Sequence, residues 1–548
     1  MNADCPSVVS SGPNDGLRNA DCRARALAWC AAFLLGLAGT ARALEPIRSV
    51  EVGANRELRV NGREFFPLMS WLQDAKRYPA LRALNVNTFC GNYKVPASEI
   101  LPAARDAGGY GVYAFDEKAI GHPALLAWLH GDEPDLPRTV SDATVTPGEG
   151  LVLNKSTPLY RIVDGVTHSW SVLDPLAGAA VTIELKKPVT VKSLGVWLTI
   201  SSGLSAAKEA AFLADGKEVL RCTLAAKKGR QAFDLPAPAT FRKLTFRVLA
   251  VEKGKNDWGS ISEIEGFDAA GKNVLLSAPY SVPRMAPEQL ATEYARIKQA
   301  DKSRPVFVTF TAYFMDEFGK FDEAERKRLY PAYVKGGDVV GFDVYPIYGW
   351  NKPEWIDYVA KGTGRLVDLA GPKRPVYAWI ETCKGSQWVS YDQQKDVLPR
   401  HTRAEVWMAI IRGATAIGYF THAWRPSFTE FNCTEDMQAE LKRLNGQITR
   451  LAPAILAPQA KAKMHMDLGE SITCHIKATA HGGAAYVFTQ SLEKSGPAKK
   501  ANFVIEGLKA GAKIEVVDEG RTIVAGNGTF TDDFAPLQEH VYRIEGLK

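Results

Sequence analysis

The sequence predicts a multidomain α/β protein, in which a parallel eight-stranded barrel is interrupted by one β-sandwich and followed by another. Eight short apolar runs, most followed by a helix-capable segment, predict the barrel. Between about Arg138 and Val282 this alternation stops, and short β-rich runs are separated by Gly, Pro and Lys turns. The pattern becomes β-rich again after Pro458. A chain of 548 residues is also too long for a single core.

The barrel strands are expected at eight apolar runs. They are Phe66–Trp71, Val86–Cys90, Gly111–Phe115, Ala127–Gly131, Val306–Thr311, Val339–Tyr345, Val376–Ile380 and Ala416–Phe420. Helix-capable stretches include Pro287–Gln299, Trp355–Leu369 and Arg403–Gly413. Eight such units predict a closed TIM (β/α)8 barrel, and without the insert its length is about the usual 250 residues. An Asn61-Gly62 pair between alternating residues predicts a hairpin just before the barrel.

Strand-like runs also define the two β domains. In the insert they are Ala180–Leu185, Ser193–Thr199, Leu244–Val251 and Asn273–Leu276, and in the C-terminal sandwich His475–Ala478, Ala484–Thr489, Asn502–Ile505, Lys513–Val517 and His540–Ile544. The expected domains are a signal peptide (1–43), a first barrel part with its hairpin (44–138), the insert (139–283), a second barrel part (284–458) and the C-terminal β-sandwich (459–548).

The N-terminal segment has the features of a cleavable signal peptide. Arg18, Arg23 and Arg25 precede the apolar run Ala26–Leu37, and small residues at 41–43 suit cleavage after Ala43. The apolar run is short for a membrane span. We therefore expect a secreted or periplasmic protein with no membrane association after cleavage, and a retained anchor is the alternative.

Composition and cysteine spacing exclude several classes. The chain is 46% hydrophobic and 23% charged, which is ordinary for globular proteins, and its net charge of +6 is dispersed without aromatic interleaving, so no nucleic-acid partner is expected. The five cysteines beyond the leader form no CxxC pair, and no HExxH motif occurs, so neither a metal nor another cofactor is expected. Cys383 and Cys433 could form a disulfide, although buried free thiols are the preferred interpretation. The oligomeric state is not predicted.

Two glutamates indicate the chemistry. Glu133 and Glu381 each stand where an apolar run ends, 248 positions apart, or 103 without the insert, which is about three βα units. In a parallel βα barrel, residues just beyond the strand C-termini line the active site. Glycosidic cleavage needs two carboxyl groups in different protonation states, so the pair predicts a glycoside hydrolase.

This layout resembles the (β/α)8-barrel retaining glycoside hydrolases of clan A. The resemblance is carried by the lead-in Val60–Pro67, the fourth-strand end Trp128–Pro134, and Glu381. It implies that Glu133 is the acid/base and Glu381 the nucleophile. The sequence departs from the family at Asp132, where Asn is commoner, which puts the usual contact to the sugar 2-hydroxyl in doubt.

The insert resembles a discoidin-like (coagulation-factor C-type) jelly roll. The resemblance is carried by Tyr160–Thr167 with Trp170, by Val181–Leu185, and by Trp258–Glu265. Such domains often bind carbohydrate, but an insert that only walls the active-site cleft fits the sequence equally well. For the C-terminal sandwich, packing alone is the preferred role.

Aromatic and polar residues near the strand ends are the substrate-binding candidates, because aromatic rings pack on sugar C–H faces while hydroxyls need polar partners. They are Trp71, Asn92, Tyr93, Asp132, Tyr313, Asp343, Tyr345, Trp379, His422 and Trp424. The alternative is that about half of the aromatic residues are barrel core.

The expected function is that of an exported glycoside hydrolase, which cleaves an oligo- or polysaccharide by a retaining double displacement. A non-catalytic carbohydrate-binding protein on a glycosidase-like barrel and a transglycosylase are the alternatives. An esterase is disfavoured because no Gly-x-Ser-x-Gly motif occurs. Glu133 could instead be a helix N-terminal carboxylate, Glu381 a rim salt-bridge partner, and Asp132 the proton donor.

Overall fold

The computed structural model describes residues 44–140, 143–154, 156–201, 203–276, 280–469 and 474–547, and these form two compact units. The first unit comprises the chain up to Glu133, Pro287–Glu317 and Ala324 onward, and the second comprises Pro134–Ala286 with Phe318–Glu323. The predicted signal peptide and its cleavage site lie outside the described residues. Within the described residues, no helix is long and apolar enough to cross a membrane.

Eight parallel strands close a barrel in the first unit, as the sequence predicts. In chain order they are β4 (Leu68–Trp71), β5 (Thr88–Cys90), β6 (Tyr110–Ala114), β7 (Leu125–Leu129), β17 (Val306–Thr311), β18 (Val339–Asp343), β19 (Val376–Glu381) and β20 (Ala416–Phe420). The ring closes where β20 pairs with β4 and where β17 pairs with β7. Each strand lies within two residues of a predicted run at both ends, because strands buried on both faces have continuous apolar sequences.

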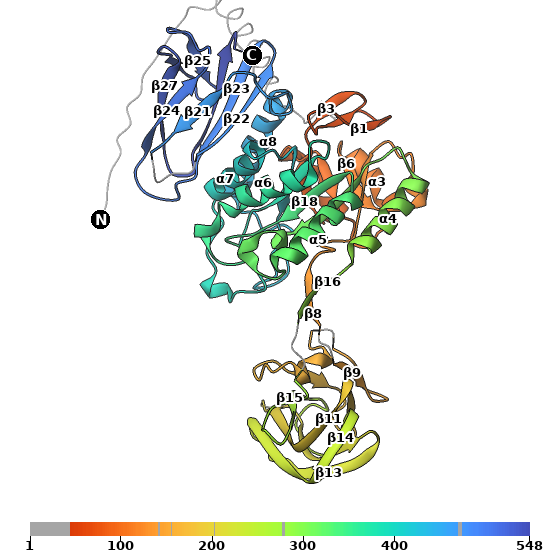
Figure 1. The fold of residues 1–548 in the computed structure, drawn as a ribbon. Coiled ribbons are helices and arrows are strands. Elements are labelled where there is room, and N and C mark those ends of the chain that lie inside the picture. The colour runs from red at the N-terminus through yellow and green to blue at the C-terminus, as the bar shows by residue number, and fades with distance from the viewer. Residues whose placement is uncertain are drawn as a thin grey trace, which may run out of the picture. The chain divides into compact units, whose positions relative to one another are not determined.

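Helices follow seven of the eight barrel strands (Figure 1). They are α2 (Tyr78–Ala83), α3 (Ala97–Asp106), α4 (Pro287–Ala300), α5 (Glu323–Tyr333), α6 (Tyr358–Ala370), α7 (Pro399–Ile411) and α8 (Glu435–Ile455). After β6 the chain forms only the 3-10 helix η2 (Glu117–Ala119) before β7 begins. The third βα unit therefore departs from the regular alternation that the sequence predicts.

Glycines make room for large aromatic side chains inside the barrel. A Cβ atom at Gly341 would lie 2.1 Å from the Tyr377 ring, and one at Gly418 would lie 2.2 Å from the Trp379 ring. Tyr377 and Trp379 are both hydrogen-bonded to Thr309 Oγ1, at 2.8 and 3.2 Å. Small residues on β18 and β20 thus complement the aromatic residues of β19.

A two-stranded ribbon joins the units. β8 (Pro137–Val140) and β16 (Tyr280–Pro283) pair antiparallel with Arg138 opposite Val282, so the chain enters and leaves the insert side by side (Figure 1). Before the barrel, β2 (Leu58–Val60) and β3 (Arg63–Phe65) form the predicted hairpin, beside β1 (Val50–Val52). Its turn residues Asn61 and Gly62 have φ values of 54° and 79°, as an Asn-Gly turn requires.

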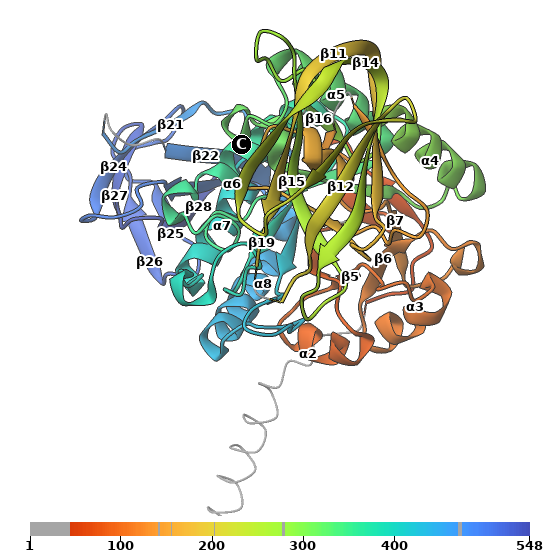
Figure 2. The same cartoon turned by 90° about the horizontal axis from the view of Figure 1, so that it is seen from below.

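One seven-stranded sheet wraps around an apolar core in the second unit. Its strands are β9 (Thr144–Pro147), β10 (Ser171–Leu173), β11 (Ala180–Thr199), β12 (Ala206–Ala214), β13 (Lys217–Thr223), β14 (Gly229–Glu252) and β15 (Gly259–Phe267), and η3 (Leu159–Val163) adds a helical turn. The long β11 and β14 run side by side (Figure 2). Two predicted strands are thus parts of β11. Asn273–Leu276 is not a strand, because Asn273 Oδ1 accepts the backbone N–H groups of Gly266 and Leu275.

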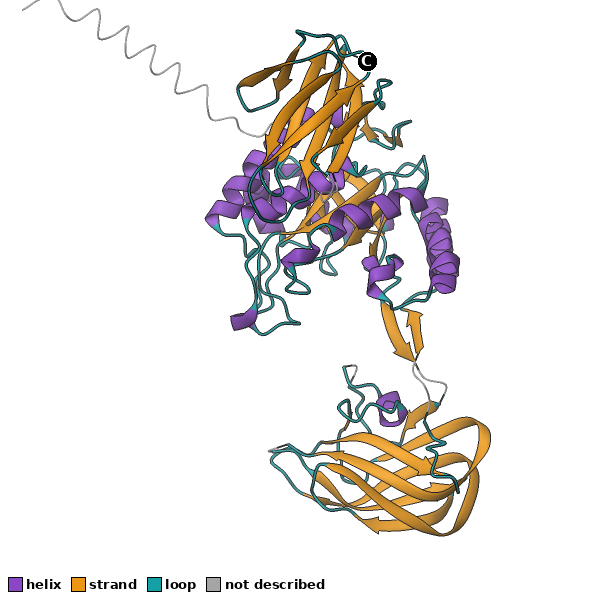
Figure 3. Ribbon diagram, turned by 60° about the vertical axis from the view of Figure 1, so that its left-hand side comes forward, coloured by secondary structure: helices purple, strands orange, loops and turns teal. Residues whose placement is uncertain are grey.

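Two sheets enclose the C-terminal core (Figure 3). One sheet holds β21 (Met464–Asp467), β24 (Lys499–Ile505) and β27 (Thr529–Phe534), and the other β22 (Cys474–His481), β23 (Ala484–Ser491), β25 (Lys513–Val516), β26 (Arg521–Val524) and β28 (Glu539–Glu545). The sandwich packs on α7, where Gln490 Nε2 donates to the carbonyl of Ala404 at 3.0 Å and Trp407 stacks on Phe488.

Candidate functional site

The charges of three carboxylates act on one buried phenol at the C-terminal rim of the barrel. Asp132 and Glu133 follow β7, Asp343 ends β18, and Tyr345 lies two residues further on. Burial raises the pKa of Tyr345 well above its usual range, and the negative charges of Asp343, Asp132 and Glu133 raise it further. Asp132 is exposed and the other two carboxylates are half-buried. The hydroxyl of Tyr345 thus senses the charges of solvent-reaching acidic groups that follow or end two different strands.

Two of these carboxylates also influence the barrel interior. The charge of Asp132 contributes to the raised pKa values of Cys90 and Tyr377, in both cases after burial, which is the main cause. Asp343 acts on Tyr377 as well. Asp132 and Asp343, from two different strand ends, are therefore both close enough for their charges to act on the Tyr377 hydroxyl.

The backbone is strained at three strand ends of this rim. Leu72, Tyr93 and Glu133 follow β4, β5 and β7, and their φ values are 48°, 37° and 48°. For residues other than glycine, a left-handed backbone costs about 1–3 kcal/mol and is concentrated at functional sites. At Glu133 this conformation belongs to the predicted acid/base residue itself.

Glu381 is placed differently from its predicted role. Its side chain is fully buried, and its two carboxylate oxygens accept the backbone N–H groups of Ile347 and Tyr348 at 2.9 and 2.6 Å. Burial raises the pKa of Glu381 to about 7, against the lowering effect of hydrogen bonds from Glu405 and these two N–H groups. A nucleophile must reach the substrate, whereas this carboxylate holds the loop after β18.

Glu405 is the residue beside Glu381 that sequence reasoning missed. It lies on α7 and is fully buried, and burial followed by the charge of Glu381 raises the pKa of Glu405 well above its usual range. The signal in the sequence is one acidic residue inside the otherwise apolar run of 404–411. A buried carboxyl needs a partner, and here the partner is another carboxyl.

Trp379 belongs to the barrel interior and not to the substrate contacts. It is 2% exposed, its indole N–H donates to Thr309, and Trp71 packs against it edge-on with ring centroids 5.1 Å apart. The prediction that Trp379 contacts the substrate is therefore corrected. Every second side chain of a strand lies on the same face, so Trp379 shares its face with residues 377 and 381 of β19. Trp71, at the end of β4, is half-buried.

Tyr93 and His422, two further predicted substrate contacts, lie close together, whereas Asn92 has a structural role. The hydroxyl of Tyr93 lies 2.9 Å from His422 Nε2, which is also 3.1 Å from the carbonyl oxygen of Leu72. Burial lowers the pKa of His422, which favours the neutral imidazole, and its Nδ1 has no hydrogen-bond partner within the described residues. In contrast, the amide of Asn92 is used by the backbone of Val95 and Ala114.

Tyr313 and Trp424 complete the predicted contacts. Tyr313 is half-buried in the 3-10 helix η4 (Ala312–Phe314) after β17. Trp424 lies beyond β20 and is exposed, with its ring 4.9 Å from that of Phe428. Trp388 and Phe428, both exposed and both in loops of the same rim, were missed because neither directly follows a strand.

No metal centre is evident in the part of the chain that the structure describes, where no three His, Cys, Asp or Glu side chains are arranged to hold an ion. Cys90, Cys222, Cys383 and Cys433 are free and buried. Cys433 Sγ lies 3.4 Å from Thr382 Oγ1, and Cys383 Sγ 3.6 Å from the carbonyl oxygen of His422. Cys383 and Cys433 are therefore free thiols with separate polar contacts, and they do not form a disulfide with each other.

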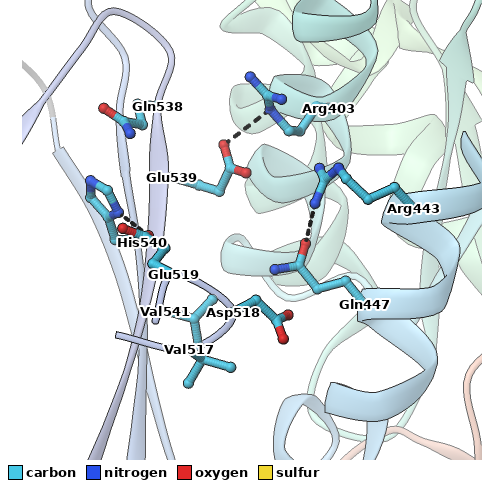
Figure 4. Close-up of a pocket in the computed structure, with 10 residues that line it drawn as sticks. All are labelled: Arg403, Arg443, Gln447, Val517, Asp518, Glu519, Gln538, Glu539, His540 and Val541. Carbon is cyan, nitrogen blue, oxygen red and sulfur yellow. Dashed lines mark hydrogen bonds and ion pairs between the residues drawn. The ribbon is translucent and has the colours of Figure 1, made fainter. Parts of the chain in front are cut away.

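A separate pocket of about 310 Å³ lies between α7, α8 and the C-terminal sandwich (Figure 4). Its charged groups pair with each other: Arg403 faces Glu539 at 3.5 Å, and His540 Nδ1 lies 2.5 Å from Glu519 Oε1. Arg443 bonds to Gln447. This internal pairing is typical of a polar seam between domains, and we place the candidate site at the barrel rim instead.

Comparisons with known proteins find likenesses only among solved structures. No family model matches the chain, and no curated protein matches it. A family 32 carbohydrate-binding module of Clostridium perfringens NanJ, solved with galactose, is 12% identical with a TM-score of 0.20, and covers 23% of this chain and 97% of its own.

Two further structures are similar to the same degree. A CBM32 module of a family 31 glycoside hydrolase from Clostridium perfringens is 14% identical (TM-score 0.20, covering 23% of this chain and 94% of its own). The CBM32 module of AlyQ, solved with 4,5-unsaturated mannuronic acid, is 15% identical (TM-score 0.19, 25% and 96%). At these scores the likenesses assign no function to the chain.

Proposed function

We propose that this protein is a glycoside hydrolase whose barrel is a variant TIM (β/α)8 barrel with a shortened third unit. The observation that carries the proposal is the group of Asp132, Glu133 and Asp343 around the buried hydroxyl of Tyr345. Glycosidic cleavage needs one carboxyl group that donates a proton and one carboxylate that attacks the sugar or activates water. For donation, one carboxyl group must keep its proton, and repulsion between neighbouring carboxylates favours this.

Glu133 is the proposed proton donor, in agreement with the clan A resemblance. It is half-buried just beyond β7, and its left-handed backbone is a strained conformation of the kind concentrated at functional sites. Asp343 is the proposed second carboxylate, because it reaches solvent at the same rim whereas Glu381 is enclosed. Tyr345 supplies a hydroxyl to this group, and Asp132 occupies the position that would contact a sugar hydroxyl.

The test is turnover by the protein that begins at Leu44, on a panel of aryl glycosides and of neutral and acidic polysaccharides. We expect hydrolysis by the wild type. Glu133→Gln should lose about 10²–10⁴-fold on substrates with poor leaving groups, and less on activated aryl glycosides, which need little protonation. No hydrolysis on any substrate, or full activity of Glu133→Gln on polysaccharides, would refute the proposal.

A second comparison decides which residue is the second carboxylate. Asp343→Asn should abolish turnover while the protein stays folded, and Glu381→Gln should alter stability more than the rate constant. The reverse result would restore Glu381 as the nucleophile. Proton NMR of the first product then reports whether the anomeric configuration is retained, as the clan resemblance implies, or inverted.

Two finer expectations belong to the same proposal. The arginine-rich, apolar leader would export the protein, so its substrate would be an extracellular or periplasmic glycan. The insert would be a carbohydrate-binding domain. A non-catalytic carbohydrate-binding protein is the rival function, and it would bind the substrates of the panel without cleaving them.

A further inference from the structure

Three exposed aromatic side chains gather on two adjoining loops of the barrel rim. Trp388 is 64% exposed in the loop after β19, and Trp424 and Phe428 are 45% and 49% exposed in the loop after β20. The rings of Trp424 and Phe428 lie 4.9 Å apart, and Phe428 stacks on His422 at 5.9 Å. We call Trp388, Trp424 and Phe428 the rim platform.

The two loops of the rim platform are fastened together by hydrogen bonds. The backbone N–H groups of Trp424 and Arg425 both donate to the carbonyl of Gly385, at 2.7 and 3.1 Å. The guanidinium of Arg425 donates to the carbonyl of Val389 at 3.3 Å, next to Trp388. The rings on the two loops are therefore held in one neighbourhood.

Gln394 fixes the shape of the loop that carries Trp388. Its Oε1 accepts the N–H groups of Gly385 and Ser386, and its Nε2 donates to the carbonyls of Ser386 and Val389. The N–H of Trp388 itself donates to Ser386 Oγ at 3.1 Å. A loop with this many internal bonds holds an exposed tryptophan at little further entropic cost on binding.

The platform is continuous with the candidate site. Trp388 packs edge-on against Tyr348, whose ring meets Phe420, and the ring of Phe420 lies 4.9 Å from that of Tyr345. On the other side, His422 connects Phe428 to the hydroxyl of Tyr93. The ring of His422 also lies 5.3 Å from that of Phe420, so both loops of the rim platform connect through rings to Tyr345.

We propose that the rim platform binds sugar units of a polysaccharide chain beyond the bond that is cleaved. Separate flat rings among polar groups fit the C–H faces of successive pyranose units, whereas a protein partner prefers a continuous apolar patch. The proposal rests on the proposed hydrolase function and adds its substrate class. The substrate is a chain of several sugar units, and a disaccharide does not reach the platform.

The experiment measures how affinity depends on chain length. In the full chain carrying Glu133→Gln, calorimetry compares disaccharides with hexasaccharides of β-1,4-glucose, β-1,3-glucose, β-1,4-mannose, β-1,4-xylose and α-1,4-galacturonic acid. In at least one series the hexasaccharide should bind about tenfold tighter, the gain expected from a well-placed aromatic contact. Adding Trp388→Ala should remove this gain and leave the disaccharide affinity unchanged.

Conservative variants separate stacking from general apolar contact. Trp388→Tyr keeps a ring and should keep most of the gain, while Trp388→Leu keeps apolar area and should lose it. Val524→Ala, at a side chain 66% exposed on the C-terminal sandwich, is the control and should change nothing. Equal binding of both lengths in every series, no binding at all, or equal behaviour of the Tyr and Leu variants would overturn the inference.

Two readouts keep this inference distinct from the hydrolase proposal. Length-dependent binding that Trp388→Ala removes, without turnover of any polymer by the wild type, would leave the platform standing and refute the hydrolase. If the wild type cleaves a polymer but Trp388→Ala does not change the length dependence of binding, the hydrolase proposal stands and the rim platform is refuted. If light scattering shows a wild-type dimer that Trp388→Ala dissociates, the patch is a contact between copies of the chain and the platform is refuted.

Discussion

Replacing Glu381 by glutamine tests whether this carboxyl controls the pH dependence of stability. In the folded protein the pKa of Glu381 is about 7, against 4.5 for an unperturbed glutamate. Between these values the folded chain keeps a proton that the unfolded chain has released. The free energy of unfolding therefore contains a contribution that is complete below about pH 4.5 and is lost as the pH rises through about 7.

The magnitude follows from the same two pKa values. One unit corresponds to 1.36 kcal/mol, so the contribution of Glu381 is about 3 kcal/mol at low pH. Glu381→Gln has no titrating proton and should show a correspondingly smaller decline between pH 4.5 and 7. The variant should also lose about 1–3 kcal/mol at all pH values, because one of the N–H groups of Ile347 and Tyr348 loses its acceptor.

The assay is urea unfolding followed by tryptophan fluorescence at several pH values from 4.5 to 7.5. Glu405→Gln is the companion variant, because the pKa of Glu405 also lies well above its usual range, so the folded chain keeps a second proton that the unfolded chain releases. This variant should likewise show a smaller decline of stability with pH than the wild type. The reasoning is wrong if Glu381→Gln has the same slope as the wild type, or if wild-type stability rises with pH in this window.

Other substitutions test the barrel and its insert. Gly341→Ala should lower the free energy of unfolding by about 1–3 kcal/mol or prevent folding, because its Cβ would lie 2.1 Å from the Tyr377 ring, and chemical unfolding measures this. Glu133→Gly should be about 1 kcal/mol more stable than Glu133→Ala in the same assay, because glycine adopts φ of 48° without strain; equal stabilities would contradict this. Replacing residues 141–279 by Asn-Gly should leave a soluble, folded barrel, because Val140 lies opposite Tyr280 in the ribbon and a two-residue turn can join them. Circular dichroism measures the fold, and an insoluble or unfolded product would contradict this prediction.

The barrel strands were predictable because each is buried on both faces. β17 and β19 have only buried residues, so their sequences are continuous apolar runs that stand out from their surroundings. The β domains were harder. β26 alternates between half-buried and exposed positions over four residues, and the polar-rich β27 has a similarly weak pattern, so both were missed. Local sequence also gave no sign that β11 continues through Lys186 and Lys187.

The places of Glu133 and Glu381 relative to the barrel strands were predictable from the sequence, but the surroundings of their side chains were not. Glu133 and Glu381 both stand at strand ends on one rim, and nothing in the neighbouring sequence distinguishes them. Their difference comes from groups distant in the chain: the N–H groups of Ile347 and Tyr348, 34 and 33 positions away, enclose the second carboxylate. Similarly, Trp379 is drawn inward by Thr309, 70 positions away. Contacts at such separations leave no local pattern.

The β8–β16 ribbon changes how the barrel can assemble. β7 and β17 must pair through Trp128 and Val306, which are 178 positions apart in the chain. Closing a flexible loop of that length, compared with one of about ten residues, costs roughly 2–3 kcal/mol of additional chain entropy. If the ribbon and its insert form first, the two strands are already tethered at neighbouring points and this entropy is no longer lost at closure. The insert can then be large without slowing the barrel, provided that it folds before the barrel closes.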